Sequence, residues 1–370
     1  MNVYYLLLVA AVLLGLQVWI FRRAGHKNIH VTRNFTKKRL FAGETLQMVE
    51  VIENRRLLPV PWLKLETRMP GELLFGRQEN LEISGNRYHR SVFFLRPWQR
   101  VRRIHDIRAL HRGYFQFSSY AMTVGDLVGL SRQTIEKSME KSIVVYPKLL
   151  SREETALPAS RWQGDAVVRR FINPDLFLYN GIRDYVPGDP IRDIHWRAYA
   201  RSGELKVKQY DYTAQRKYLV LLNVVLHENQ WGEINPDDES NMEYAISLAA
   251  SLMVYALQDG LEVGFGANGY AKPFEGECIL LPPASGAQQS ELVLESCARL
   301  VPKRVKNFHV FLKEMPLPRD TDIVLLTGYV NESIEIEAER LKAEGNTVTI
   351  LPVLCEESHK DLHREGRESA

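Results

Sequence analysis

The sequence predicts a multidomain protein with three successive parts: an N-terminal transmembrane helix, a small antiparallel β-sandwich and an α/β domain. Three observations support this prediction. A run of 19 residues near the N-terminus carries no charge. The stretch after it alternates short apolar runs with turn residues, and the last part of the chain alternates strand-like with helix-like segments. At 370 residues the chain is long enough for two or three domains.

The overall composition is that of an ordinary folded protein, with 45% hydrophobic and 25% charged residues. A net charge of +3 is small for this length. Nucleic-acid-binding proteins usually carry a large basic excess, so we expect no nucleic-acid partner. Cys278, Cys297 and Cys355 lie far apart and form no C-x-x-C pair. This spacing predicts neither a zinc site nor a disulfide framework, and we expect no cofactor.

Residues 3–21 predict a single transmembrane helix. Such a helix spans about 28 Å, close to the ~30 Å hydrocarbon core of a bilayer. Tyr4, Tyr5 and Trp19 lie where interfacial aromatic residues are enriched. Only basic charges follow the run until Glu44. The positive-inside rule then predicts a single-pass protein of the cell membrane, in contact with the lipid bilayer, with its body in the cytoplasm. A nucleic-acid-binding arm is the competing interpretation of the basic run.

Residues 29–147 predict a β-sandwich-like domain, because short apolar runs alternate with Gly, Pro and Asn turn signals. The expected strands are Leu46–Glu53, Trp62–Thr67, Arg90–Leu95, Arg103–Leu110 and Ile143–Tyr146. We expect loops at Arg112–Tyr114 and at Asp126–Leu130. His89, His105 and His111 lie among arginines, and we expect surface or half-buried side chains rather than metal ligands.

Residues 148–215 predict a linker that leads into a charge-dense segment from Gly181 to Lys208. Pro187–Pro190 is a strong turn signal, because Pro fixes φ and Gly accepts positive φ. After it we expect a short helix around Ile191–Ala200, a stop at Gly203 and a strand that starts at Leu205–Val207.

The charge-dense segment has three interpretations. It can be an interdomain brace of Arg–Asp pairs with Trp196 as a hydrophobic plug, because bidentate pairs fix geometry well. It can be a recognition patch for an anion or an acidic segment, with donors Arg183, Arg192, Arg201 and Lys208. A catalytic site would pair His195 with Asp193 or Asp189, but no Ser or Cys nucleophile is placed beside them. The residues alone favour the brace.

Residues 216–355 predict an α/β domain with a mostly parallel sheet, because strand-like and helix-like segments alternate. The expected strands are Lys217–Leu226, Leu261–Gly266, Asp322–Thr327 and Thr347–Leu354. The expected helices are Ser240–Gln258, with a capping box of Ser240 and Glu243, Gln288–Leu300, closed by Pro302, and Ser333–Glu344. His309–Leu312 is ambiguous. Residues 356–370 form a charged tail, which we expect to be loose.

The charge-dense segment resembles the signature of the DUF58 family. The matching residues are Arg183, Tyr185, Pro187, Gly188, Asp189, Arg192, Ile194, Trp196, Ala198, Ala200, Arg201, Gly203, Leu205, Val207 and Lys208. The resemblance extends to the membrane segment, to Val145–Pro147 and to the α/β domain. Family members often begin with a two-helix hairpin, whereas only one span is present here. The candidates for partner contact are Arg183, Tyr185, Asp189, Arg192, Trp196, Arg201 and Lys208.

The order of elements in the α/β domain is similar to that of a von Willebrand factor A domain, which the DUF58 resemblance also implies. In such domains an Asp-x-Ser-x-Ser motif at the end of the first strand binds Mg²⁺ through oxygen atoms. Asn223, Val225 and His227 occupy those positions here. An Asp is also expected around Thr327–Gly328, and none is there. We therefore predict that the metal site is lost.

The resemblance implies a membrane-anchored, non-enzymatic scaffold or adaptor on the cytoplasmic face. It implies protein partners: a MoxR-type AAA+ ATPase and a transglutaminase-like membrane protein. A second hypothesis is a membrane-associated hydrolase or transferase that uses Arg183, Asp189 and His195. A third, a metal-dependent adhesion-like binder, rests on the fold alone and is opposed by Asn223.

Overall fold

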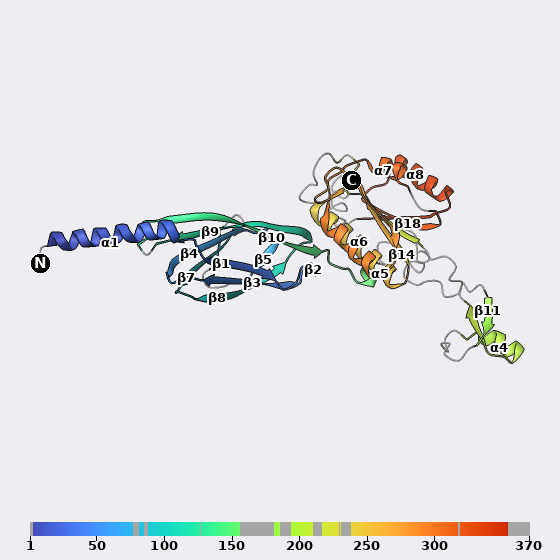
Figure 1. Cartoon of the computed structure of the whole chain (residues 1–370). Coiled ribbons are helices and arrows are strands. Elements are labelled where there is room, and N and C mark those ends of the chain that lie inside the picture. Colours follow the sequence, from blue (N-terminus) through green and yellow to red (C-terminus); the bar gives the residue numbers. More distant parts are fainter. Residues whose placement is uncertain are drawn as a thin grey trace, which may run out of the picture. The chain divides into compact units, whose positions relative to one another are not determined.

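The computed structural model divides the chain into two compact units, Met1–Lys148 and Leu149–Ala370 (Figure 1). The residues that it describes are 3–76, 81–84, 88–126, 128–155, 181–185, 194–209, 217–228, 230, 238–316 and 319–353.

The first unit begins with helix α1, which covers Val3–Ala24. Its side chains are mostly exposed, but Phe21 in the last turn is buried. The helix is long and apolar enough to cross a membrane from Val3 to Arg23. A helix whose apolar side chains are exposed on nearly every side is typical of a membrane span rather than of a surface helix of a soluble domain.

Two β-sheets face each other in the rest of the first unit (Figure 1). One sheet has the order β1-β3-β8-β5, and the other has the order β2-β10-β9-β4-β7-β6. The strands are β1 (Ile29–Phe35), β2 (Arg39–Phe41), β3 (Thr45–Asn54), β4 (Val60–Arg68), β5 (Leu73–Phe75), β6 (Leu81–Ser84), β7 (Tyr88–Leu95), β8 (Arg100–Ala109), β9 (Gly113–Gly125) and β10 (Arg132–Tyr146). The neighbouring strands pair antiparallel, except that β2 and β10 pair parallel.

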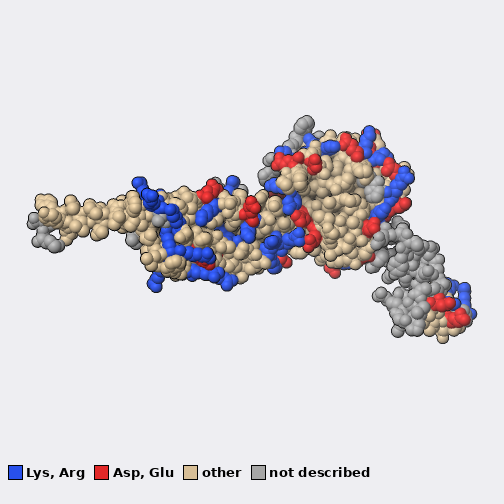
Figure 2. Space-filling view, in the orientation of Figure 1, with Lys and Arg blue, Asp and Glu red and all other residues tan. Residues whose placement is uncertain are grey.

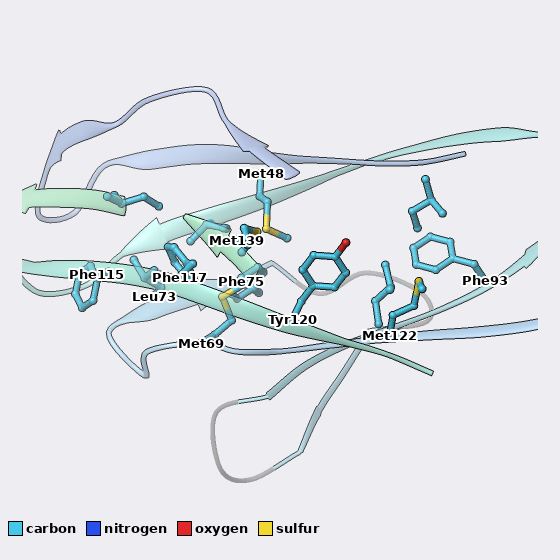
Figure 3. Packing of buried hydrophobic residues seen from close by; sticks show 14 of the residues in the cluster. Met48, Met69, Leu73, Phe75, Phe93, Phe115, Phe117, Tyr120, Met122 and Met139 are labelled. Carbon is cyan, nitrogen blue, oxygen red and sulfur yellow. The ribbon is translucent and has the colours of Figure 1, made fainter. Parts of the chain in front are cut away.

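The core of this β-sandwich lies between the two sheets (Figure 3). In β3 every second residue is buried, beginning with Leu46 and Met48, so that one face of the strand points inward. Phe117 and Met122 come from the opposite sheet and are also buried. The apolar residues whose alternation predicts the strands are therefore the residues that fill the core.

Some of the expected boundaries in the β-sandwich are wrong. The loop expected at Arg112–Tyr114 is mostly strand, because β9 begins at Gly113. Strand β10 begins at Arg132, well before the expected Ile143. The first part of β10 is polar and alternates exposed with half-buried side chains, so its apolar pattern is weak. Strand β1 was not expected for the same reason.

The second unit contains a five-stranded sheet with the order β16-β14-β13-β18-β19. Its strands are β13 (Lys217–Leu222), β14 (Glu262–Ala267), β16 (Ile279–Ala284), β18 (Thr321–Thr327) and β19 (Thr347–Pro352). All of the pairs are parallel except that of β14 with β16, which forms an antiparallel edge. The chain starts in the middle of the sheet at β13 and adds strands on both sides, which is a doubly wound arrangement.

Among the residues described, four helices accompany this sheet: α5 (Glu239–Gln258), α6 (Ala287–Arg299), α7 (Phe308–Glu314) and α8 (Glu332–Ala343). Leu219 and Leu221 of β13 belong to one cluster with apolar residues of α7 and α8. Side chains alternate between the faces of a strand, so Tyr218, Val220 and Leu222 face the other side, and α5 packs against β13. The sheet is therefore buried on both faces, as its continuous apolar strands predict.

Several details of the α/β prediction need correction. Strand β13 ends at Leu222 rather than at Leu226. Helix α5 begins at Glu239 with Asp238 as its N-cap, so Ser240 lies inside the helix and not at the N-cap position that the expected capping box requires. The segment at His309 is helical. Strand β16 was not expected. The helix before Pro302 is followed by a short strand, β17 (Leu300–Val301), which pairs with another short strand, β15 (Tyr270–Ala271).

Candidate functional site

The charge-dense segment forms a β-hairpin that encloses a short helix. Strand β11 (Gly181–Asp184) pairs antiparallel with β12 (Lys206–Gln209), so that Asp184 lies opposite Lys206. Lys206 Nζ forms ion pairs with the carboxylates of Asp184 and of Glu204. Ile194 forms an isolated bridge with Val207, and both of these side chains are buried. The Asp184–Lys206 ion pair therefore joins β11 to β12, and the Ile194–Val207 pair joins the residues just before α4 to β12.

Helix α4 covers Trp196–Ser202 and is fixed at both ends. At its N-terminus, Nδ1 of His195 accepts a hydrogen bond from Ala198 N at 2.9 Å. At its C-terminus, Gly203 has φ of 72° and donates its N–H to the Tyr199 carbonyl. Glycine adopts this left-handed conformation without steric cost, so the predicted stop at Gly203 is confirmed. The helix begins later than the expected Ile191, because His195 caps it.

The outer surface of α4 carries exposed aromatic side chains. Trp196 is 58% exposed and Tyr199 is 42% exposed, and their rings meet edge to face with centroids 6.3 Å apart. Arg197 and Arg201 on the same helix are also exposed. The prediction that Trp196 is a hydrophobic plug is therefore wrong: the buried side chains under this helix are Ile194 and Val207 instead.

The other predicted contact residues are placed only in part. Tyr185 is half-buried, and its backbone N–H donates to the Leu205 carbonyl at 3.0 Å. Arg183 and Lys208 lie in β11 and β12, but their side chains are outside the described residues. Asp189 and Arg192 also lie outside the described residues, as does the Pro187–Pro190 turn. The structure therefore brings Tyr185, Trp196 and Arg201 onto one hairpin.

A second candidate lies at the carboxyl ends of the parallel strands, where doubly wound folds place their ligands. Asn223 follows β13 there, and its side chain is buried. Its Oδ1 accepts from Asn268 Nδ2 at 3.0 Å and from Val225 N at 3.1 Å, and its Nδ2 donates to Thr327 Oγ1 at 3.0 Å. An amide oxygen has two lone pairs, so both lone pairs of Asn223 Oδ1 are used within the protein.

The other positions of the expected metal motif also supply no free oxygen ligand for magnesium. Val225 is buried and offers no side-chain oxygen, and the exposed His227 lies with its Nε2 3.1 Å from Asp238 Oδ1. Gly328 follows β18, and a Cβ atom there would lie 2.3 Å from the carbonyl oxygen of Leu226. The backbone at Leu226 therefore excludes the Asp that a metal motif would place at this position.

A third cluster, inside the β-sandwich, was not predicted from the sequence. Arg33 Nε donates to Glu50 Oε1 at 2.6 Å, and both side chains are buried. Arg33 Nη1 also donates to Thr67 Oγ1 on the opposite sheet. The rings of His89 and His105 lie 4.9 Å apart beside this pair, and both residues are buried. The cluster therefore links the two sheets through the core.

The charges of this cluster are set by its burial. Burial alone would raise the pKa of Glu50, but the positive charge of Arg33 and the neighbouring His105 outweigh it, and the pKa falls to about 2. Burial lowers the pKa of His89 to about 3, and the charge of Arg33 acts in the same direction. His105 Nε2 lies 3.7 Å from Glu50 Oε2, beyond hydrogen-bond distance. Glu50 is thus ionised and His89 is neutral near pH 7.

The sequence gives only a weak indication of this cluster. Arg33, Glu50, His89 and His105 all fall at inward positions of alternating strands. Charged residues in a strand usually point to solvent, so the sequence alone favours the surface for each of them. Only the pairing of β1 with β3, which places Arg33 opposite Glu50, shows that the two charges compensate each other.

The hairpin, helix α4 and the α/β sheet all lie in the stretch that a family model matches. The model is that of "Protein of unknown function DUF58", and it matches residues 181–367. The chain belongs to the DUF58 family. The predicted resemblance of the charge-dense segment to the DUF58 signature is therefore confirmed.

A DUF58-related sequence from Bacillus subtilis (strain 168), described as "Uncharacterized protein YeaD", is 21% identical to this chain over 341 residues. The match covers 91% of this chain and 78% of that protein.

Solved structures are only distantly similar to this DUF58 protein. Escherichia coli alpha-2-macroglobulin, spanning domain MG7 to the C-terminus, shares 14% identity at a TM-score of 0.26, over 33% of this chain and 24% of that chain. An uncharacterized Nocardia farcinica protein with an immunoglobulin-like fold shares 10% identity at a TM-score of 0.22, over 31% and 97% of the two chains. These similarities are too weak to bear on function.

Proposed function

We propose that this DUF58 protein is a membrane-anchored, non-enzymatic adaptor that binds a protein partner through α4. The observation that carries the proposal is the exposed aromatic pair of Trp196 and Tyr199 on a short helix fixed at both ends. Tryptophan, tyrosine and arginine are the residues most enriched at the centres of protein interfaces. Arg197 and Arg201 beside the pair add charges that complement an acidic partner surface.

The anchor in this proposal is α1. Its last turn carries Arg22 and Arg23, Lys27 follows it, and no acidic residue precedes Glu44. Under the positive-inside rule this charge pattern keeps the β-sandwich and the α/β unit in the cytoplasm.

A non-enzymatic role is supported by the way in which the candidate polar groups are used. The Nδ1 atom of His195 caps α4, and Oδ1 of Asn223 already accepts two hydrogen bonds. We propose that the α/β unit is von Willebrand factor A-like, which its doubly wound sheet with one antiparallel edge strand supports. In our proposal it binds protein without a metal ion.

The proposed partners are those that the resemblance of the charge-dense segment implies: a MoxR-type AAA+ ATPase and a transglutaminase-like membrane protein. In this proposal the ATPase acts in the cytoplasm, so it reaches α4 only if the body of the protein lies on that side of the membrane.

The test is co-purification of the tagged full-length protein from detergent-solubilised membranes. We expect an AAA+ ATPase to co-purify with the wild type, and Trp196→Ala or Tyr199→Ala to reduce its recovery at least tenfold, since interface anchors of this type typically contribute about 2 kcal/mol or more. Phe274→Ala is the matched control, because Phe274 is an aromatic side chain of the same unit that is even more exposed (69%) than Trp196 or Tyr199. Equal recovery with all three variants would reject the α4 contact.

A further inference from the structure

Three loops of the β-sandwich meet at the end where α1 joins it. They connect β3 to β4, β7 to β8 and β9 to β10. Only residues 25–28 separate α1 from β1, and these residues are bonded to the loops. Arg55 N donates to the Asn28 carbonyl at 3.0 Å, and Arg56 Nη2 donates to the Gly25 carbonyl at 2.8 Å. The side chain of Gln133 in β10 donates to a backbone carbonyl in the last turn of α1.

The same three loops carry large apolar side chains that point into solvent. Leu57 is 79% exposed, Trp98 is 68%, Val128 is 53% and Leu130 is 65%. Trp98 has φ of 57°, a conformation that is rare for a residue of this size. Its loop is nevertheless held in place, because Trp98 N donates to the Arg56 carbonyl at 3.2 Å. Each loop therefore presents at least one exposed apolar side chain at the α1 end.

This end of the β-sandwich is also strongly basic. Its exposed basic residues are Arg22, Arg23, Lys27, Arg55, Arg96, Arg100 and Arg132. The acidic side chains nearby are Glu53, which pairs with Arg55 and Arg100, and the buried Asp126. Figure 2 shows Lys and Arg side chains gathered on the part of the β-sandwich next to α1.

The basic excess is a property of the first unit and not of the chain. Residues 22–148 contain 24 Lys and Arg against 11 Asp and Glu, a net charge of +13 with histidine neutral. Residues 149–370 contain 24 basic and 34 acidic residues, a net charge of −10. The small net charge of the whole chain therefore conceals two units of opposite sign.

We propose that these three loops form a second membrane contact, which docks on an anionic lipid bilayer beside α1. This inference rests on the proposed membrane anchor, because α1 brings the loops to the bilayer surface. Apolar tips surrounded by arginine and lysine are the combination that binds an interface containing anionic lipid. Tryptophan is favoured at this depth, and long basic side chains reach the headgroups while their stems stay apolar. The contact would hold the β-sandwich against the membrane.

The test uses the full-length protein in proteoliposomes with a fluorophore at a single introduced cysteine. Cys278 and Cys355 are replaced by Ser, and Cys297 is retained because it is buried. Leu130→Cys probes the loops. Leu110→Cys is the matched control, because Leu110 is also exposed (40%) but follows β8 at the end of the β-sandwich away from α1. Leu13→Cys reports on α1 itself.

We expect the probe at position 130 to shift to shorter emission wavelength and to be quenched by a lipid that carries a spin label near its headgroup. The effect should be greater in vesicles that contain phosphatidylglycerol than in pure phosphatidylcholine, and the probe at position 110 should show neither change. Arg96→Glu combined with Arg132→Glu should remove the dependence on phosphatidylglycerol.

Three outcomes would overturn the loop contact or separate it from the anchor. If probe 13 is quenched by lipid and probe 130 behaves like probe 110, α1 spans the membrane and the loop contact is wrong. If probe 130 is shielded in detergent and is not quenched by lipid, another protein surface covers the loops, and the inference is again wrong. Quenching at position 130 by the headgroup label, with no quenching at position 13 by a lipid labelled deep in its acyl chain, would support the loop contact and reject the anchor.

Discussion

Arg33 and Glu50 form an ion pair with both side chains completely buried between the two sheets of the β-sandwich. Two charges are costly to remove from water, and their attraction offsets this cost only when the geometry is good. Here Arg33 Nε lies 2.6 Å from Glu50 Oε1, and a second nitrogen of Arg33 contacts Thr67 of the facing sheet. Through these two contacts, Arg33 joins the ion pair in its own sheet to the facing sheet.

Removing one partner of this pair should destabilise the β-sandwich strongly. We expect Glu50→Ala to lower its free energy of unfolding by about 3–5 kcal/mol, because Arg33 remains buried and uncompensated. The measurement is hydrogen exchange of the β3 and β8 amides in the full-length protein. The double variant Arg33→Met with Glu50→Leu should recover most of the loss. A single variant with unchanged protection would show that the pair contributes little.

The β-sandwich should lose stability in acid in two overlapping ranges. His89 has a folded pKa of about 3 against an ordinary value of 6.5, so the unfolded state binds more protons between these values and stability falls as pH falls from 6.5 to 3. Glu50 has a folded pKa of about 2 against 4.5, so its contribution is lost as pH falls from 4.5 to 2. His89→Gln should flatten the upper range, as measured by denaturant unfolding at several pH values.

Mg²⁺ should not bind at the end of β13. Both lone pairs of Asn223 Oδ1 are used, by Asn268 and by the backbone of Val225. Calorimetric titration of the full-length protein with Mg²⁺ is expected to give no heat beyond dilution. Binding heat that disappears in Asn223→Ala would contradict this expectation and place a metal at the site. The same substitution should cost about 1–3 kcal/mol of stability, since it leaves buried polar groups unpaired.

A methyl group at Gly328 should disturb the carboxyl edge of the α/β sheet. The added Cβ would lie 2.3 Å from the Leu226 carbonyl oxygen, so the backbone has to move. We expect Gly328→Ala to lower the thermal midpoint of the α/β unit, at a cost of about 1–3 kcal/mol. Gly76→Ala in the β-sandwich serves as a control for the loss of a glycine, because the nearest atom to its Cβ, the Asp106 carbonyl oxygen, lies at an ordinary 3.6 Å. A midpoint of the α/β unit that is the same in Gly328→Ala as in the wild type would refute the steric argument.

The sequence predicts those parts of the fold in which apolar residues follow a regular period. Strands β3 and β18 and helix α8 lie close to their predicted ranges, because their apolar side chains alternate or recur with the helical period. Strand β16 contains two prolines and lies at a sheet edge, where proline is tolerated, so its sequence resembles a loop.

The sequence signature predicts where the candidate site lies in the chain, but the sequence does not predict the geometry of the site. The stop at Gly203 follows from glycine alone, whereas the cap by His195 depends on the local backbone. A tryptophan in a charge-dense segment suggests a buried anchor. Trp196 is exposed instead, because Ile194 and Val207 pair with each other and are the buried residues of the hairpin. Contacts between distant segments, such as Arg33 with Glu50, depend on strand pairing that the local pattern does not specify.

Strand β10 extends from Arg132, beside the last turn of α1, to Tyr146, near the exit of the chain from the first unit, with one irregularity in its register between Ser138 and Lys141. Its 15 residues correspond to about 45–50 Å of extended chain. In a protein anchored through α1, the length of this strand sets the distance between the membrane end of the β-sandwich and the point at which the second unit begins. Shortening β9 and β10 together by matched pairs of residues would therefore bring the start of the second unit closer to α1.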